Sequence, residues 1–519
     1  MAENGLKNAK YTDLLPWSSA PETTKSFVTR ICALLLEYVE TTFDRSTKVV
    51  DFMQPEDLKT KIDLDLRDEP ENLDKIVDLC RTSLEYSVRS GHPYFFNQLF
   101  AGIDVVALMG DFLSSTVNVS MYTYEMGSVF VLMEQEVLKK MRSLIGFEKG
   151  DGIFAPGGSM SNIYGMNLAR YKMFPEVKTK GMRALPPLVM FTSEEGHYSV
   201  QKSANLLGMG TDSVIAISTD DVGRIVPGDL RAKVLDAKSK GYCPFMVNAT
   251  SGTTVRGAFD PLNAIADICQ EFGMWLHIDA AWGGAVLLSR KHRHLMKGSH
   301  RADSVTWNPH KMMGVPLQCS AFMTKHEVPF KINRFSMYYL FLCPQGVLQE
   351  CNSAHATYLF QKDKKQYDVS LDTGDKAIQC GRHVDIAKLW LSWKARGNSG
   401  YERKVNHAFE MAQYLTDQVR KREGFQLVTE PEYVNIGFWY FPPSIRDLPD
   451  GPEKTQKLHK VGPEVKKGMT KKGSLLVGYQ ICKEFCNYFR MIVHNEAVGK
   501  ADMDYVLDEV ERLGKDLKF

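Results

Sequence analysis

Short apolar runs rich in β-branched residues alternate with helical patterns through the middle of the chain. The runs lie at 187–191, 214–217, 245–248 and 275–278. Strands of this length that are separated by helices usually pair in parallel, with right-handed crossovers between them. The pattern therefore predicts an α/β domain with a mostly parallel sheet that is covered on both faces.

Different patterns flank this central region. Residues from about 22 to 88 carry apolar positions at helical spacing, which predicts a helical N-terminal arm. After about residue 380, a long helical stretch, two apolar runs and a final helix predict a smaller α+β C-terminal lobe. We expect three parts, with these bounds: a helical N-terminal segment at 1–90, a large α/β domain at 91–380 and a small C-terminal domain at 381–519.

Composition narrows the class of protein. A chain of 519 residues has room for two to four domains, and 44% hydrophobic with 24% charged residues is the balance of an ordinary globular protein. The net charge of +2 gives no field that would favour nucleic acid. The apolar runs fall short of the roughly 20 residues that span a bilayer, so we expect no membrane span.

Cysteine usage indicates the compartment. The ten cysteines show no CxxC pair or regular spacing, and the first residues lack a signal peptide. Reduced cysteines in the cytoplasm are the simplest interpretation.

The basic run at 290–294 lacks carboxylate or cysteine ligands at a suitable spacing, so we expect no metal.

The most informative motif is Asn308-Pro309-His310-Lys311, which follows the strand pattern ending at Asp279. A lysine in a turn past one strand and an aspartate at the end of an earlier one can face a single planar cofactor. The lysine amine would form a Schiff base with the aldehyde of pyridoxal 5'-phosphate, and the carboxylate would keep the pyridine nitrogen protonated. Each residue alone has a plainer interpretation, a surface lysine or a helix cap.

Three further stretches fit the same cofactor. Pro156–Asn162 combines glycines and hydroxyls before an apolar helix, where a phosphate is favoured, and Asn308 and His310 could complete that cradle. His197 follows the strand that ends at 191 and could lie flat on a cofactor ring. Thr250 ends the next strand and could hydrogen-bond the cofactor; a capping turn is the plainer alternative.

Together these motifs closely resemble the group II pyridoxal-phosphate decarboxylases, in particular the branch of glutamate and cysteine sulfinate decarboxylases. Matching stretches run from about His92 to the final helix. The resemblance implies the aminotransferase type I fold (the PLP-dependent transferase fold), a homodimer, and conversion of a small acidic amino acid to an amine and carbon dioxide. A transaminase or another lyase on the same fold is the alternative within enzymes.

The resemblance also implies roles for single residues. Lys311 corresponds to the Schiff-base lysine, Asp279 to the pyridinium partner and His197 to the stacking residue. Arg490 corresponds to the arginine that binds the substrate α-carboxylate, and Tyr367 to the tyrosine that protonates the carbanion. The remaining cofactor residues by resemblance are Thr250, Ala281, Met160, Ser161, Asn308 and His310.

Substrate choice depends on the distal pocket, for which the resemblance implies Gln98, Phe100, Ser120 and Tyr122. Phe100 and Tyr122 are similar to the cysteine sulfinate and aspartate branch, whereas the stretches 312–315 and 381–385 are more similar to glutamate decarboxylases. We expect L-cysteine sulfinate to give hypotaurine and L-aspartate to give β-alanine. The alternative is L-glutamate, which would give γ-aminobutyrate.

One segment departs from the family. Residues 328–345 form an aromatic-rich insertion where relatives have a short turn, and the loop 361–366 is one residue longer than usual. Our hypothesis is an in-frame retained intron, and transcript sequencing tests it. A catalytically impaired splice form, folded and dimerising but inactive, is therefore a second alternative.

Overall fold

The computed structural model describes residues 6–19, 21–327, 346–361, 363–482 and 485–519. The insertion at 328–345 lies outside the described residues. The chain divides into two compact units. The first comprises Met1–Gly102, Asp417–Val428 and Phe438–Phe519, and the second comprises Ile103–Thr416 and Thr429–Gly437. The three-part division expected from the sequence stays a prediction.

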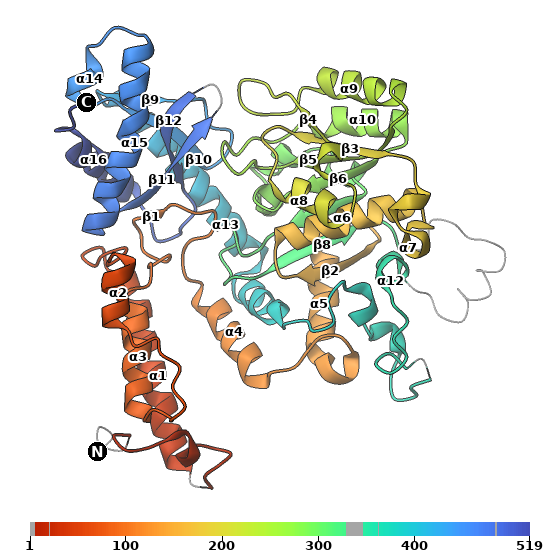
Figure 1. The fold of residues 1–519 in the computed structure, drawn as a ribbon, viewed down its shortest axis with the longest axis horizontal. Coiled ribbons are helices and arrows are strands. Elements are labelled where there is room, and N and C mark those ends of the chain that lie inside the picture. The colour runs from red at the N-terminus through yellow and green to blue at the C-terminus, as the bar shows by residue number, and fades with distance from the viewer. Residues whose placement is uncertain (1–5, 20, 328–345, 362, 483–484) are drawn as a thin grey trace. The chain divides into compact units, whose positions relative to one another are not determined.

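The second unit is built on a seven-stranded sheet with the order β2-β8-β7-β6-β5-β3-β4 (Figure 1). The five strands from β7 to β4 pair in parallel, and β8 pairs antiparallel with both β2 and β7. Its strands are β2 (Asp151–Ala155), β3 (Leu188–Ser193), β4 (Val214–Ile217), β5 (Cys243–Thr250), β6 (Trp275–Asp279), β7 (Ser304–Trp307) and β8 (Ser320–Thr324). The expected α/β class with a mostly parallel sheet is confirmed.

Helices flank this sheet on both sides (Figure 1). The central helix is α6 (Gly158–Met173), which packs along β5, β6, β7 and β8. Apolar side chains of α6 and of the strands that it covers form one buried core, which includes Tyr164, Leu168 and Phe322. The other principal helices of this unit are α4 (Val105–Val117), α5 (Tyr124–Ile145), α8 (Ser199–Leu206), α9 (Pro227–Ser239), α10 (Leu262–Phe272), α12 (Val347–Asn352) and α13 (Asp385–Lys421), whose last residues from Asp417 belong to the first unit.

The first unit contains a helical pair and a smaller sheet. Helices α1 (Pro21–Thr42) and α3 (Leu73–Glu85) pack through a small apolar cluster that includes Leu34 and Val77. The five-stranded sheet has the order β1-β11-β12-β10-β9. Its elements and the nearby helices are β1 (Phe95–Phe96), β9 (Phe425–Leu427), β10 (Asn435–Tyr440), β11 (Leu476–Cys482), β12 (Phe485–Ile492), α2 (Pro55–Lys61), α14 (Pro443–Arg446), α15 (Pro452–Lys472) and α16 (Lys500–Gly514).

Among the described residues, no helix is long and apolar enough to cross a membrane.

Candidate active site

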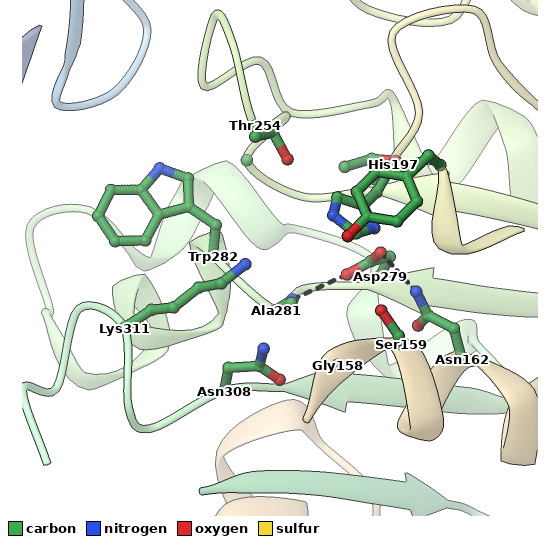
Figure 2. Close-up of a pocket in the computed structure, with 13 residues that line it drawn as sticks. Gly158, Ser159, Asn162, His197, Thr254, Asp279, Ala281, Trp282, Asn308 and Lys311 are labelled. Atoms are coloured by element: carbon green, nitrogen blue, oxygen red, sulfur yellow. Dashed lines mark hydrogen bonds between the residues drawn. The ribbon is translucent and has the colours of Figure 1, made fainter. Parts of the chain in front are cut away.

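A pocket of about 190 Å³ lies where β5 and β6 end and α6 begins (Figure 2). Parallel strands present their carboxyl ends along one edge of the sheet, which is where ligands of such folds bind. The register pairs Thr250 of β5 with Asp279 of β6, so that the two final residues are direct neighbours. The lining residues are Gly158, Ser159, Asn162, His197, Tyr198, Thr250, Gly252, Thr254, Asp279, Ala281, Trp282, Asn308 and Lys311.

Six of the residues predicted from the sequence share this wall: His197, Thr250, Asp279, Ala281, Asn308 and Lys311. They come from stretches of the chain up to about a hundred residues apart, and the parallel topology brings them to one place. Figure 2 shows the Lys311 side chain extending toward the space that the Asp279 carboxylate also faces. The pocket therefore holds an amine and a carboxylate in the arrangement expected from the motif.

The Asp279 carboxylate is buried and held by donors on both oxygens. Its Oδ1 accepts from the backbone N–H of Ala281 at 3.1 Å, and its Oδ2 accepts from Asn162 Nδ2 at 2.8 Å. Hydrogen bonds of this kind to a charged acceptor are among the stronger ones in proteins. The carboxylate is thus fixed in direction as well as in place.

The cationic groups near Asp279 are shifted by burial. Burial lowers the pKa of the Lys311 ammonium, and the Asp279 carboxylate opposes this shift. Burial also lowers the pKa of His197, where Asp279 opposes the shift and Lys311 adds to it. A buried ammonium loses its proton more readily, and a neutral amine is the form that attacks a carbonyl. Lys311 is therefore poised as a nucleophile.

The amino terminus of α6 forms another part of the wall. Gly158 leaves no room for a side chain, because a Cβ atom there would come within 2.7 Å of Asn308 Nδ2. Ser159 stands beside it, and the first backbone N–H groups of a helix attract anions. The buried Thr250 hydroxyl has no hydrogen-bond partner among the described residues. These donors fit a phosphate and a planar polar ring.

Three predicted cofactor residues lie outside the lining set. Ser161 bonds to Ser320 Oγ at 2.8 Å, and Ser320 in turn donates to Asn308 Oδ1 at 2.6 Å. His310 accepts from the backbone N–H of Cys319 at 2.9 Å. Ser161 therefore supports Asn308 through Ser320. Met160 packs against the core of the sheet.

The predicted substrate and proton-transfer residues lie apart from the lining set. Tyr367 accepts a hydrogen bond from Lys364 Nζ at 2.8 Å, and its hydroxyl donates to Asp372 at 3.0 Å. Ser120 accepts from the backbone N–H of Arg382, and Tyr122 is half-buried.

The other predicted substrate residues belong to the first unit. Arg490 on β12 donates to the backbone carbonyl of Asn97 at 2.8 Å. Burial lowers the pKa of the Arg490 guanidinium. Gln98 is exposed, and the Phe100 ring packs against Phe95.

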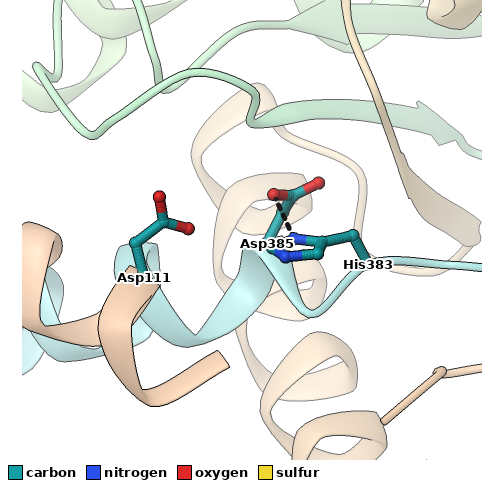
Figure 3. Close-up of side chains that lie close together, drawn as sticks. All are labelled: Asp111, His383 and Asp385. Carbon is teal, nitrogen blue, oxygen red and sulfur yellow. Dashed lines mark hydrogen bonds and ion pairs between the residues drawn. The ribbon is translucent and has the colours of Figure 1, made fainter. Parts of the chain in front are cut away.

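A second cluster of ionisable groups was not expected from the sequence. Asp111, His383 and Asp385 lie together (Figure 3). The buried Lys388 ammonium reaches both carboxylates, at 3.2 Å from Asp111 and 2.9 Å from Asp385. Since this lysine already compensates the two acids, we assign no metal ion to the cluster.

Sequence reasoning missed several wall residues, above all Ser159, Asn162 and Trp282. Ser159 and Asn162 are three positions apart at the start of α6, so that they share one face of the helix. The spacing shows that the two residues share a face, but it does not show that this face lines the pocket.

Comparison with known proteins gives a family and a set of structural relatives. The family model of the pyridoxal-dependent decarboxylase conserved domain matches residues 55–441. Mouse CSAD, and mouse CSAD in its apo form, each match with a TM-score of 0.90 at 48% identity, covering 96% of this chain and 100% of theirs. Tryptophan decarboxylase from Catharanthus roseus, solved with L-tryptophan, matches with a TM-score of 0.81 at 22% identity, covering 96% and 99%. At that identity the match shows the shared fold alone.

Proposed function

Because the chain belongs to the pyridoxal-dependent decarboxylase family, we propose that it converts L-cysteine sulfinate to hypotaurine and carbon dioxide. Its fold is that of the pyridoxal-phosphate transferases of type I, as the family implies. The similarity to mouse CSAD over nearly the whole chain supports this substrate. The observation that carries the proposal is the placement of Lys311 and Asp279 in one pocket at the carboxyl ends of parallel strands.

Lys311 and Asp279 would hold the two reactive ends of the cofactor. Pyridoxal phosphate, when bound, supplies an electron sink for the electron pair that remains after carbon dioxide leaves. The Lys311 amine would bind the aldehyde carbon, and its lowered pKa favours the neutral form that this needs. Asp279, held by Asn162 and Ala281, would keep a proton on the pyridine nitrogen.

The remaining wall residues would fix the cofactor in the pocket. We assign the phosphate to the amino terminus of α6 with Ser159 and Asn308, and a ring substituent to the Thr250 hydroxyl, which is buried and has no partner among the described residues. His197 would pack on the ring. Met160, Ser161 and His310 would act through their support of Asn308 and of the strand ends.

Arg490 and Tyr367 would handle the substrate. A guanidinium binds a carboxylate through two parallel hydrogen bonds, which suits Arg490 to the α-carboxylate. Tyr367 would donate the proton that replaces carbon dioxide at the α-carbon. A misplaced proton would instead lead to transamination and loss of the cofactor.

The distal end of the substrate would meet Gln98, Phe100, Ser120 and Tyr122. Bulk at Phe100 would shorten the space for the substrate side chain by about a methylene, a difference that enzymes use to discriminate by about 1–3 kcal/mol. We therefore place L-cysteine sulfinate and L-aspartate ahead of L-glutamate, which is longer.

We further propose a homodimer in the cytoplasm. Helix α4 exposes a row of large apolar side chains, an arrangement that marks an interaction surface when it is contiguous. The row comprises Val105, Val106, Met109, Phe112, Leu113 and Val117. A second copy of this chain is the occupant that the family suggests. The eight cysteines whose side chains the structure describes are free thiols, in keeping with a reducing compartment.

The test is the stoichiometry of the products. Purified protein with added pyridoxal phosphate is given carboxyl-labelled L-cysteine sulfinate, and carbon dioxide, amine and keto acid are measured together. Decarboxylation predicts one carbon dioxide per amine and no keto acid. Keto acid without carbon dioxide would favour the transaminase alternative and overturn the proposal. Lys311→Ala is the control that should abolish both products.

A further inference from the structure

A chain of buried hydrogen bonds runs behind the pocket from the far end of β6. Side chains along a strand alternate between its two faces, so Trp275, His277 and Asp279 point to the same face. That face is the one that α6 covers, because Asn162 of α6 bonds to Asp279 and Gly165 of α6 lies against the His277 ring. All three side chains are buried, and the second of them, a histidine, had no role in the function derived above.

Trp275, at one end of this chain of hydrogen bonds, fixes which atom donates and which accepts. The indole Nε1–H can only donate, and it donates to Ser304 Oγ at 2.8 Å. The Ser304 hydroxyl is then free to donate its own proton to His277 Nδ1, which lies 2.8 Å away. His277 Nδ1 is therefore an acceptor, and in a neutral ring the proton must sit on Nε2.

The direction is fixed independently at the other end by Asp279. A carboxylate can only accept, so the Asn162 atom 2.8 Å from Asp279 Oδ2 is the amide nitrogen. The Asn162 carbonyl oxygen then faces His277 Nε2 at 3.1 Å and accepts its proton. Whether one starts from Trp275 or from Asp279, the proton of His277 lies on Nε2. Every donor in this chain of hydrogen bonds meets an acceptor.

Asn162 also opens a branch to His197. Its second Nδ2 hydrogen is donated to Ser199 Oγ at 2.9 Å, and Ser199 Oγ lies 2.8 Å from His197 Nδ1. The backbone N–H of Ser199 points at the same ring nitrogen, at 3.2 Å. Because that N–H can only donate, His197 Nδ1 is an acceptor too. The His197 ring proton is thus directed to Nε2.

Packing keeps the chain in place. A Cβ atom on Gly165 would come within 2.7 Å of His277 Nδ1, so the ring occupies the space that only a glycine on α6 leaves open. Burial lowers the pKa of His277 to about 4, although Asp279 opposes the shift. The ring is therefore neutral at physiological pH, and Asp279 faces an amide instead of a second charge.

We propose that Asn162 and His277 are positioning residues that fix the Asp279 carboxylate and the tautomer of His197 for the cofactor. This inference rests on the proposed function, because it takes Asp279 to be the partner of the pyridine nitrogen. The two residues act through Asp279 and His197 on the way the cofactor is held, and they hold no atom of the substrate.

The first test is cofactor affinity, measured by titrating the apo-protein with pyridoxal phosphate and following protein fluorescence. Asn162→Asp keeps the size of the side chain and replaces the donor with an acceptor. We expect its Kd to rise about 10- to 100-fold, the range for losing one hydrogen bond to a charged group. Asn495→Asp is the matched control, since Asn495 is a buried asparagine of the first unit whose Nδ2 donates to the backbone carbonyls of Gly91 and His92. It should change Kd less than threefold.

Two outcomes separate failure of this inference from failure of the proposed function. Asp279→Asn should weaken cofactor binding and shift its visible absorbance; if it does neither, the assignment of Asp279 itself is wrong. If Asp279→Asn has both effects and Asn162→Asp binds like the unmodified protein, only the positioning role is overturned.

A second measurement reads the histidine tautomers in the unmodified protein. In apo-protein labelled with ¹⁵N-histidine, two-bond correlations report which ring nitrogen carries the proton. We expect His277 and His197 to be protonated on Nε2 alone at pH 7.5, with His277 assigned by loss of its signals in His277→Gln. A proton on Nδ1 of His277 would contradict the directed chain.

Discussion

At the scale of single residues, the Lys311 amine can attack an aldehyde only in its neutral form. Its amine lies in the same pocket as a carboxylate, yet burial outweighs that carboxylate and lowers its pKa. The balance between burial and the carboxylate sets the fraction of neutral Lys311. It would therefore decide how fast the apo-protein takes up its cofactor at a given pH.

This gives a prediction for the pH dependence of cofactor capture. A lowered pKa means that Lys311 releases its proton at a lower pH, so the rate constant for pyridoxal phosphate uptake should rise with pH and level off below the ordinary lysine value of 10.5. Stopped-flow absorbance measures that rate. Asp279→Asn removes the charge that favours the ammonium and should move the inflection lower still. An inflection at or above pH 10.5 would show that burial does not outweigh the Asp279 carboxylate at Lys311.

Phe100 allows a prediction about specificity. If its ring shortens the substrate pocket, Phe100→Ser should raise the ratio of kcat/KM for L-glutamate over L-cysteine sulfinate by about 10- to 200-fold. Adding Tyr122→Phe should move the ratio further in the same direction. Steady-state assays of both substrates measure it. An unchanged ratio would remove Phe100 from the distal pocket.

Some of the residues that line the pocket could be predicted from the sequence. Lys311 and Asp279 stood out because their chemistry is rare in combination, and the structure places both in one pocket. The stretch 156–162 was recognised as an anion site, but the side chains chosen were Met160 and Ser161, and Ser159 and Asn162 line the wall instead. Which side of a helix faces a cavity depends on how the helix packs, and the sequence of one turn does not contain that information.

At the scale of elements, β6 combines the core and the site. One face of this strand carries Trp275, His277 and Asp279, so the same alternation that packs the strand against α6 also aims the carboxylate at the pocket. Its strand pattern and that of β3, β4 and β5 were predicted from β-branched runs. The antiparallel strands β2 and β8 were not, because Asp151–Ala155 contains Asp, Gly and Ala and Ser320–Thr324 contains Ala, residues that are depleted in strands.

The buried histidines make stability depend on pH. Burial lowers the pKa of His277 and of His310 to about 4, from an ordinary value of 6.5. Between these values the unfolded chain binds more protons than the folded one, so stability is lost as the pH falls through this window. From pH 6.5 to pH 5, each histidine should lower the free energy of unfolding by about 1–2 kcal/mol.

Urea unfolding of the apo-protein at several pH values checks this prediction. His310→Gln should reduce the pH dependence, because one of the histidines with a lowered pKa no longer titrates. His300→Gln, at an exposed position, is the matched control and should leave the dependence unchanged. Equal slopes in all three proteins would show that acid acts elsewhere.

At the scale of the whole molecule, we expect a second copy of the chain to cover the exposed apolar row on α4. Replacing two of its members, Met109→Lys with Phe112→Glu, should convert a dimer to monomers in analytical ultracentrifugation. Leu206→Lys is the control, since Leu206 is a large exposed apolar residue of the same unit on another helix. If both variants sediment as the unmodified protein does, α4 is not the interface.

The most direct measurement of the central claim is product formation from three competing substrates. Purified protein with pyridoxal phosphate receives equal concentrations of L-cysteine sulfinate, L-aspartate and L-glutamate, and the amines are separated and quantified. We predict hypotaurine as the main product, with β-alanine second. γ-Aminobutyrate as the main product would contradict the proposed substrate, and no amine from any of the three, with cofactor bound, would contradict the proposed activity itself.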